Sequence, residues 1–166
     1  MRRLKHFKSR EGENSLWEWE KVKNPLRVVF NFVIIYSARY LPSLRLKNFF
    51  YRLVGIKVGR KVSVGLGAVF DIFFPELIEI GDNTIIGYNT VVLAHEFLVN
   101  EYRTGRVEIG KNVLIGANCT VLPGIKIGVS ATVSACSLVN KNVPAGAFVG
   151  GVPIKQLKKS LKKENK

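Results

Sequence analysis

His95 is the residue of this sequence best suited to moving a proton. It lies in the central, apolar part of the chain, whereas the second histidine, His6, lies among basic residues near the N-terminus. Imidazole has an ordinary pKa of about 6.5, so near neutral pH it can take a proton from an alcohol or an amine. Because a single histidine in a turn is more often a solvated surface residue, the role of His95 depends on the pattern around it.

The other side chains that bind metals or form covalent bonds give weaker signals. Cys119 and Cys136 are the only cysteines, both have apolar neighbours, and no CxxC motif is present. Two thiols are too few for a disulfide framework and favour a reducing, cytoplasmic location. A zinc site built from three histidines is excluded, because the chain has two. We therefore expect no metal.

The central part of the chain repeats with a period of six residues. An aliphatic residue is followed by glycine at Ile80-Gly81, Ile86-Gly87, Ile109-Gly110, Ile115-Gly116 and Ile127-Gly128. Helices need apolar spacings of three and four, and single strands alternate by two. A period of six instead predicts short strands joined by tight turns and wound into a solenoid, in which three strands close a coil of about 18 residues. The same frame runs back through Phe74, Ala68 and Val62 to Ile56.

The repeat is interrupted once, directly after His95. The spacing from Val92 to Ile109 is not a multiple of six, so residues 97–108 are expected to leave the coil as a loop. The histidine therefore stands at the junction between a regular coil and this loop.

The chain from Ile80 to Lys158 resembles the bacterial hexapeptide-repeat acetyltransferases, which include galactoside, maltose, serine and xenobiotic acetyltransferases. The segments that carry the resemblance are IGDNTIIGYNTVVLAHEF, EIGKNVLIGANCTVLPGIKIG and VNKNVPAGAFVGGVPIKQLKK, in that order. With weaker repeats from Val54 onward, the likeness covers about two thirds of the chain. It implies a mainly β fold, a left-handed parallel β-helix preceded here by N-terminal α-helices. The hand follows from the resemblance alone, because the general rule for parallel crossovers predicts the opposite one.

The resemblance also implies a function. It implies a transferase that moves an acetyl group from acetyl-CoA to a hydroxyl or amino group of a sugar or related small molecule, with His95 as the base that assists direct attack. Enzymes of this family form homotrimers, place their active sites between subunits, and extend the loop after the histidine over a neighbouring subunit. The identity of the acceptor and the choice between O- and N-acetylation stay open.

Several further residues match family positions that bind the coenzyme. Ala117 and Ala135 are three repeats apart, so they would stack on adjacent coils about 4.8 Å apart, where a pantetheine arm could lie against backbone N–H groups. The residues that match contacts to the nucleotide end are Asn140, Lys141, Lys155 and Lys158. Small residues at a tight corner and lysines in a basic tail would also be expected without a ligand.

Two carboxylates are candidates for binding the acceptor. Asp71 precedes His95 by four repeats, which in a regular coil is one complete turn and one further face. We therefore expect Asp71 and His95 to lie at different corners of one chain, and to meet only across a subunit interface. Asp71 matches the approximate place of a substrate-binding Asn or Asp in the family, although a solvated turn aspartate fits equally well. Glu96 is a weaker candidate.

Charge is concentrated at the two ends of the chain. Residues 1–61 hold 15 basic and 4 acidic side chains, residues 62–151 hold 5 and 7, and residues 152–166 hold 6 and 1. Nucleic-acid-binding domains tend to carry basic and aromatic residues together on their folded surface. Because the repeat region is nearly neutral, we expect no nucleic-acid partner.

The N-terminal third is expected to be helical at residues 15–23, 25–40 and 43–54. Ser15 and Glu18 form a capping-box pattern, and Pro25 suits a first helical turn. The middle helix is apolar almost all round, so it is expected to be buried as a cap on the open end of the solenoid or to lie in a membrane interface. Its uncharged stretch, from Val28 to Ala38, is shorter than the roughly 20 residues that a bilayer requires.

The chain thus divides into a basic tail and helical cap (1–54), a β-helix (55–151) with its active-site loop (97–108), and a basic C-terminal tail or helix (152–166). We expect a cytoplasmic protein that is either free or peripheral to the inner face of the membrane. The alternative function is a membrane-associated or scaffold β-helix without catalysis. Such a protein would be expected to lack the histidine, the loop and the Lys-x-Val-Pro segment, all of which are present.

Overall fold

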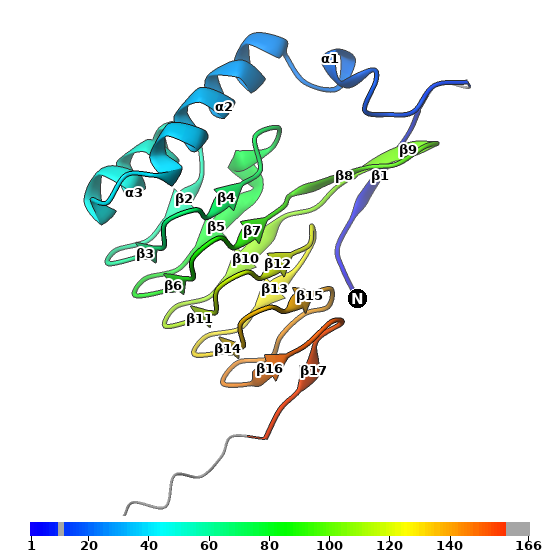
Figure 1. Cartoon of the computed structure of the whole chain (residues 1–166). Helices are drawn as coiled ribbons and strands as arrows, with labels where there is room; N and C mark the ends of the chain where they lie inside the picture. Colours follow the sequence, from blue (N-terminus) through cyan, green and yellow to red (C-terminus); the bar gives the residue numbers. More distant parts are fainter. Residues whose placement is uncertain (10–11, 159–166) are drawn as a thin grey trace, which may run out of the picture.

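The computed structural model describes residues 1–9 and 12–158, and its body is a parallel β-helix of three sheets. Figure 1 shows the coils stacked beneath helices α2 and α3, with a separate arm of strands at one side. The prediction of a solenoid of short strands is confirmed. We call its three sheets the first, second and third faces, in the order in which the chain visits them.

Strands of two or three residues form each face. The first face consists of β2 (Lys57–Val58), β5 (Ile78–Ile80), β10 (Val107–Ile109) and β13 (Lys126–Ile127). The second consists of β3 (Ser63–Val64), β6 (Ile85–Ile86), β11 (Leu114–Ile115), β14 (Thr132–Val133) and β16 (Phe148–Gly150). The third consists of β4 (Val69–Phe70), β7 (Val91–Val92), β12 (Thr120–Val121) and β15 (Leu138–Val139). The neighbouring strands within these sets are parallel, and β17 (Lys155–Gln156) adds to β16 in the antiparallel sense.

The turns between faces explain why asparagine recurs in the sequence. Asn83, Asn89, Asn112 and Asn118 have φ values between 54 and 56°, a region that asparagine adopts more readily than most residues. Their side chains stack from coil to coil: Asn83 Nδ2 donates a hydrogen bond to Asn112 Oδ1 at 2.9 Å, and Asn89 Nδ2 to Asn118 Oδ1 at 3.0 Å. The amides therefore hold the corners in register.

The glycines of the repeat are required by the closeness of adjacent coils. A Cβ atom on Gly116 would lie 2.4 Å from the backbone nitrogen of Ala135 on the next coil. The aliphatic residue before each of these glycines points inward, and Ile80, Ile86 and Ile115 are almost fully buried. The six-residue pattern thus reflects one inward side chain followed by one close backbone contact.

The first coil is longer than a regular coil of three repeats. Ile115 pairs with Val133, which lies three repeats further along the chain, whereas Val64 pairs with Ile86, which lies beyond that regular spacing. The additional residues form a bulge that contains the 3-10 helix η1 (Pro75–Leu77).

This bulge makes the frame drawn back from Ile80 through Phe74 to Ile56 wrong. The strand positions that pair with the second coil are occupied by Val58, Val64 and Phe70. The repeat is out of step before Ile80 because the bulge adds residues that belong to no strand.

The N-terminal helices are α1 (Trp19–Val22), α2 (Pro25–Arg39) and α3 (Leu44–Leu53). The helices expected at 25–40 and 43–54 are confirmed, but the one expected at 15–23 is a single turn. Ser15 does not cap it, because its hydroxyl donates to the Leu98 carbonyl at 2.7 Å and accepts from the Leu98 N–H at 3.0 Å. The segment before α1 is therefore held by hydrogen bonds to Leu98.

Side chains of α3 close the open edge of the first coil. Lys47 Nζ donates to the carbonyls of Val64 and Gly65 at 3.1 and 2.9 Å, and Asn48 Nδ2 donates to that of Val62 at 2.8 Å. Both donors are buried, and burial lowers the pKa of the Lys47 ammonium. Because a buried carbonyl without a partner costs about 1–3 kcal/mol, these side chains replace the strand that the first coil lacks.

The expected loop is an ordered hairpin. Strands β8 (His95–Phe97) and β9 (Glu101–Thr104) pair in the antiparallel sense, and β1 (Lys5–Lys8) adds to β9. Part of the expected N-terminal tail is therefore a strand of this arm, and Phe7 stacks on Tyr102 with ring centroids 4.6 Å apart.

The C-terminal segment divides into two parts. Residues 152–158, expected as a tail or helix, contain strand β17. The remainder of that prediction, residues 159–166, lies outside the described residues.

Candidate functional site

His95 lies against Asp71 of the same chain. Its Nδ1 atom is 2.5 Å from Asp71 Oδ2. The expectation that the two residues lie at different corners is therefore wrong. It assumed a regular coil of three repeats, but the bulge lengthens the first coil. Asp71 consequently falls directly beside the segment that leads into His95, and its N–H donates to the Val92 carbonyl at 3.0 Å.

The Asp71 carboxylate is fully enclosed and accepts hydrogen bonds at both oxygens. Its side chain has no exposed surface. Oδ1 accepts from the N–H groups of Phe73 and Phe74, each at 2.8 Å, and Oδ2 accepts from the Ala94 N–H at 2.7 Å as well as from the imidazole. Every partner of the two oxygens is a donor, which suits a carboxylate. The aspartate therefore has no free oxygen to offer a substrate and acts only through His95.

This arrangement indicates which nitrogen of His95 is free. A carboxylate can only accept, so Nδ1 carries the proton in this hydrogen bond and Nε2 keeps its lone pair. A histidine held in this tautomer can receive a proton at Nε2, and the anion beside it stabilises the imidazolium that forms.

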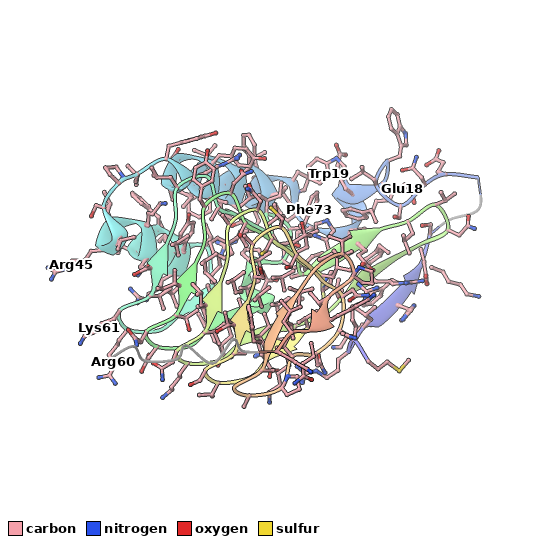
Figure 2. The ribbon with its side chains drawn as sticks, turned by 60° about the horizontal axis from the view of Figure 1, so that its bottom comes forward. Glu18, Trp19, Arg45, Arg60, Lys61 and Phe73 are labelled. Atoms are coloured by element: carbon pink, nitrogen blue, oxygen red, sulfur yellow. The ribbon has the colours of Figure 1, made fainter. Side chains whose placement is uncertain are left out.

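Aromatic rings restrict access to the imidazole. Phe97 and Phe73 meet it edge-on, with ring centroids 4.7 and 4.8 Å away. Trp19 packs on the outer side of Phe73 at 5.8 Å, and Figure 2 shows this pair beside the arm. The His95 side chain retains 13% exposure. The imidazole is therefore mostly enclosed, with aromatic rings against it.

Glu96 contacts the segment before the N-terminal strand. It forms an ion pair with Arg2, and both side chains are about one-fifth exposed. The contact ties the start of the chain to the arm that begins at His95. Sequence reasoning gave no signal for it, because the two residues are 94 positions apart.

The remaining predicted residues divide between two edges of the third face. Asn140 and Lys141 follow β15, on the edge where His95 follows β7, and we call this edge the histidine corner. Ala117 and Ala135 precede β12 and β15 on the opposite edge, which we call the alanine corner. In one chain the histidine and the alanines are therefore not brought together.

The alanine corner presents free backbone donors. Within the described part of the chain, the N–H groups of Ala117 and Ala135 donate no hydrogen bond. The N–H of Cys136, the residue after Ala135, donates to the Ala117 carbonyl at 2.8 Å. Lys155 lies beyond this corner, opposite Gly150 at the end of the second face. The exposed side chain of Lys158 follows two residues after β17. Small side chains, unpaired N–H groups and a nearby lysine suit a long, phosphate-bearing ligand.

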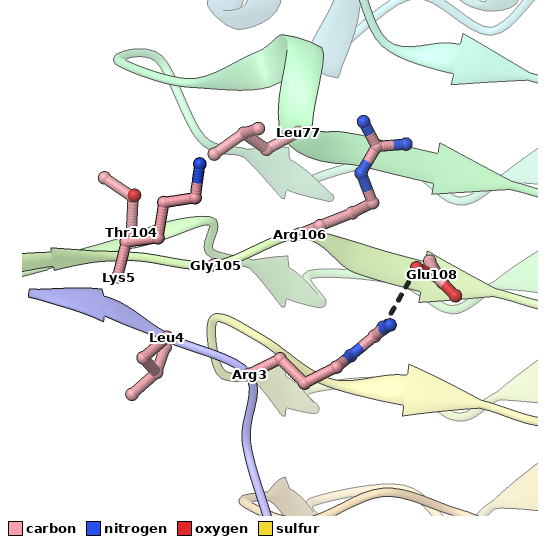
Figure 3. A pocket seen from close by; sticks show the side chains of 8 residues that line it. All are labelled: Arg3, Leu4, Lys5, Leu77, Thr104, Gly105, Arg106 and Glu108. Carbon is pink, nitrogen blue, oxygen red and sulfur yellow. Dashed lines mark ion pairs between the residues drawn. The ribbon is translucent and has the colours of Figure 1, made fainter.

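A cavity of about 550 Å³ lies between the N-terminal segment and the first face (Figure 3). Its lining consists of Arg3, Leu4, Lys5, Leu77, Thr104, Gly105, Arg106 and Glu108. Arg3 and Glu108 form an ion pair across it at 2.9 Å. None of the predicted site residues lines it, but Thr104 in its lining is the residue of β9 that pairs with His95 of β8. Among the described residues, no group of three His, Cys, Asp or Glu side chains is arranged to hold a metal ion.

Comparison with known sequences gives a consistent result. A family model described as a hexapeptide repeat of succinyl-transferase matches residues 106–141. YvoF of Bacillus subtilis (strain 168), named a candidate acetyltransferase, is 52% identical over 145 residues, which are 87% of this chain and 84% of that protein.

Two solved structures share the architecture. The hexapeptide-repeat acetyltransferase VCA0836 of Vibrio cholerae O1 biovar eltor, complexed with acetyl coenzyme A, superposes with a TM-score of 0.65 at 22% identity over 82% of this chain and 88% of its own. A galactoside acetyltransferase in complex with coenzyme A gives 0.65 at 21% identity over 81% and 80%. The fold is thus the left-handed parallel β-helix expected from the resemblance.

Proposed function

Because the chain belongs to the hexapeptide-repeat acetyltransferase family, we propose that it transfers an acetyl group from acetyl-CoA to a hydroxyl group, or an amino group, of a sugar or related small molecule. The 52% identity to YvoF over most of both chains carries the family assignment. The observation that carries the chemistry is the Asp71–His95 pair, a base held in one tautomer by an enclosed carboxylate.

The reaction is a direct transfer without an acyl-enzyme intermediate. The acceptor oxygen or nitrogen attacks the thioester carbonyl while His95 Nε2 takes its proton. The tetrahedral intermediate then loses the sulfur, the C–S bond breaks, and the proton passes from the imidazolium to the thiolate. The products are the acetylated acceptor and coenzyme A. Asp71 acts as a positioning residue in this scheme and not as the substrate-binding group expected from its sequence position.

Acetyl-CoA would bind along the alanine corner. The unpaired N–H groups of Ala117 and Ala135 suit the amide-rich pantetheine arm, and an N–H of this kind can also stabilise the oxyanion. Lys155 and Lys158 would meet the phosphates, as point charges without the bidentate geometry of arginine. Asn140 and Lys141 lie on the histidine corner, so we assign them to contacts with acetyl-CoA that is bound at the alanine corner of a neighbouring subunit.

Completion of the site therefore requires a second subunit. The histidine corner of one chain and the alanine corner of its neighbour would face one another in a homotrimer. The third face separates the two corners within one chain, and an extended repeat is about 20 Å long. That distance exceeds the reach of the His95 side chain. The scaffold alternative does not account for an enclosed carboxylate aimed at a histidine.

A first test needs no acceptor. We would measure acetyl-CoA binding by calorimetry for the wild type and for a Lys155→Ala, Lys158→Ala variant, with Lys111→Ala, Lys126→Ala as the charge-matched control. The proposal expects about one site per chain and weaker binding only in the first variant. Absence of binding at millimolar ligand contradicts it.

The two cysteines allow a footprint of the alanine corner. Cys136 is exposed beside Ala135, whereas Cys119 is buried, and burial raises the pKa of its thiol. Acetyl-CoA is expected to slow alkylation of Cys136 and to leave Cys119 unmodified throughout. Unchanged alkylation of Cys136 at saturating acetyl-CoA contradicts the proposed location.

Catalysis is tested by coenzyme A release with a panel of sugars and amino sugars. His95→Ala is expected to lower kcat/KM by about 10²- to 10⁴-fold, while His6→Ala provides the matched control. Equal activity of the two variants would exclude His95 as the base.

A further inference from the structure

Helix α2 presents an apolar face to the outside of the molecule. Its inner side packs through Val28, Ile35 and Ala38, and the Asn31 amide donates to the Ile72 carbonyl at 2.8 Å. The opposite side carries the outer apolar face, which we define as Leu26, Val29, Phe30, Phe32, Val33 and Tyr36. A surface helix would ordinarily carry polar residues there.

The exposure of this face is large. Leu26 is 81% exposed, Val29 55% and Val33 52%. The sequence expectation of a buried helix is therefore met on one side only. Tyr40, directly after the helix, and Phe49 and Leu53 of α3 are exposed apolar residues as well. An exposed apolar surface of this size marks a binding site on a stable protein.

Arginines border the outer apolar face on both sides. At about 100° per residue, Arg27 falls at one margin of the apolar arc and Arg39 at the other. Arg27 lies over Phe30 at 5.5 Å, and Arg39 lies over Tyr36 and Tyr40 at 5.7 and 5.2 Å. The guanidinium groups therefore frame the apolar residues.

The charge around this face has a single sign. Between Glu20 and Asp71 the sequence contains no acidic residue and ten lysines and arginines. Within the described residues, Arg27, Arg39 and Arg45 form no ion pair. Figure 2 shows Arg45 projecting outward at the same end of the molecule as Arg60 and Lys61. The partner of this surface must therefore be apolar where it meets the helix and anionic around it.

We propose that the outer apolar face of α2 docks on a membrane that contains anionic lipids. The helix of 15 residues is about 22 Å long and would lie in the plane of the interface, with its apolar side chains among the acyl chains and the arginines at the headgroups. No helix in residues 1–9 and 12–158 is long and apolar enough to cross a bilayer. The proposed attachment is therefore peripheral.

A second copy of the chain related by a two-fold axis fits this face less well. A two-fold contact would place identical surfaces together, so Arg27, Arg39 and Arg45 of each copy would approach those of the other with no acidic residue between them. Like charges at an interface disfavour such a contact. An anionic lipid surface instead supplies the opposite charge.

Docking would bring the Asp71–His95 pair close to the lipid surface. Asn31 of α2 holds the carbonyl of Ile72, the residue after Asp71. Docking on the membrane does not depend on acetyl transfer. A failure to bind vesicles would therefore leave the proposed enzyme activity untouched, and a failure of acetyl transfer would leave the proposed docking untouched.

The test is sedimentation of the full chain with vesicles. Vesicles of phosphatidylcholine alone are compared with vesicles that also contain phosphatidylglycerol, at low and high salt. We expect binding to the anionic vesicles, weakened by salt. A Val29→Glu, Val33→Glu variant is expected to lose at least tenfold in affinity. A Val99→Glu, Val129→Glu variant changes two similarly exposed valines elsewhere and is the matched control.

Two results would overturn the proposal. One is a wild type that sediments with neither vesicle, and a changed oligomeric state of the Val29/Val33 variant would then assign the face to contact between copies. The other is equal binding of the Val29/Val33 variant and its control. Circular dichroism would establish that both variants are folded.

Discussion

The first coil and the coil formed by β10, β11 and β12 are built from the same repeat, yet they do different things. The coil from β10 to β12 keeps a spacing of three repeats to the next coil, and its inward aliphatic residues recur there. The first coil is longer, and its bulge supplies both backbone donors that enclose Asp71 oxygen Oδ1. The regular repeats form the stack of coils, and the bulge of the first coil positions the base.

Substitution of Asp71 should separate chemistry from binding in the irregular coil. Asp71→Asn is expected to lower kcat about a hundredfold. An amide can accept from a protonated Nδ1 or donate to an unprotonated one, so it does not fix the tautomer of His95, and it has no charge to stabilise the imidazolium. The KM for acetyl-CoA should stay unchanged, since the enclosed Asp71 carboxylate has no free oxygen for a ligand. Steady-state kinetics with the best acceptor provides the measurement. A parallel rise in KM would indicate that the bulge also shapes the coenzyme site.

Replacement of Lys47 tests how far the first coil depends on its cap. Lys47→Met keeps the aliphatic stem but leaves the carbonyls of Val64 and Gly65 without donors. We expect a loss of about 3 kcal/mol in the free energy of unfolding, measured by urea titration. Arg45→Met, at an exposed position of the same helix, is the control and should cost little. Equal stability of the two variants would mean that water satisfies this edge.

A methyl group at Gly116 tests the regular coils. The new Cβ would lie 2.4 Å from the Ala135 backbone nitrogen, so Gly116→Ala should force adjacent coils apart at a cost of about 1–3 kcal/mol. Gly146 has open space around its Cβ position and a φ of 66°, so Gly146→Ala shows the effect of backbone strain alone. Urea titration of both variants makes the comparison. A smaller loss at Gly116 than at Gly146 would show that close stacking is not what the glycine provides.

The smallest effect is expected where the N-terminus meets the arm. Arg2→Ala removes the ion pair with Glu96, and partly exposed ion pairs contribute about 1 kcal/mol or less. Global stability should hardly change, while hydrogen exchange of the β9 amides should accelerate because β1 pairs less firmly. If exchange is unchanged, the strand pairing and the Phe7–Tyr102 stack, and not the ion pair, hold β1 on the arm.

The regular coils could be predicted from the sequence because each repeat contains the residues that determine its own geometry. Ile109, Ile115 and Ile127 reveal an inward position and a close contact without reference to distant residues. The site was only half readable. His95 could be identified from the interruption of the repeat, but its contact with Asp71 required knowledge of the bulge at residues 71–77, where no repeat marks the register.

Other features stayed hidden because their partners are far apart in sequence. The tail strand β1 contacts the arm about 95 residues later, and nothing in residues 5–8 indicates that pairing. One lysine in a helix that also contains Arg45 and Arg52 gave no hint that Lys47 would substitute for a missing strand. The motif Asp-x-Phe-Phe after a strand could have suggested an aspartate bonded to the N–H groups that follow it, since aspartate commonly binds backbone two residues on.

The antiparallel strand β17 has a consequence for how these molecules behave at high concentration. A stack of parallel strands ends in an edge that can accept another parallel strand, which is a route to fibres. Here α3 occupies one end of the stack with side-chain donors, and β17 covers the second face at the other end with reversed polarity. A second molecule cannot continue that sheet in the same direction, so the second face of the coil is protected against growth into filaments.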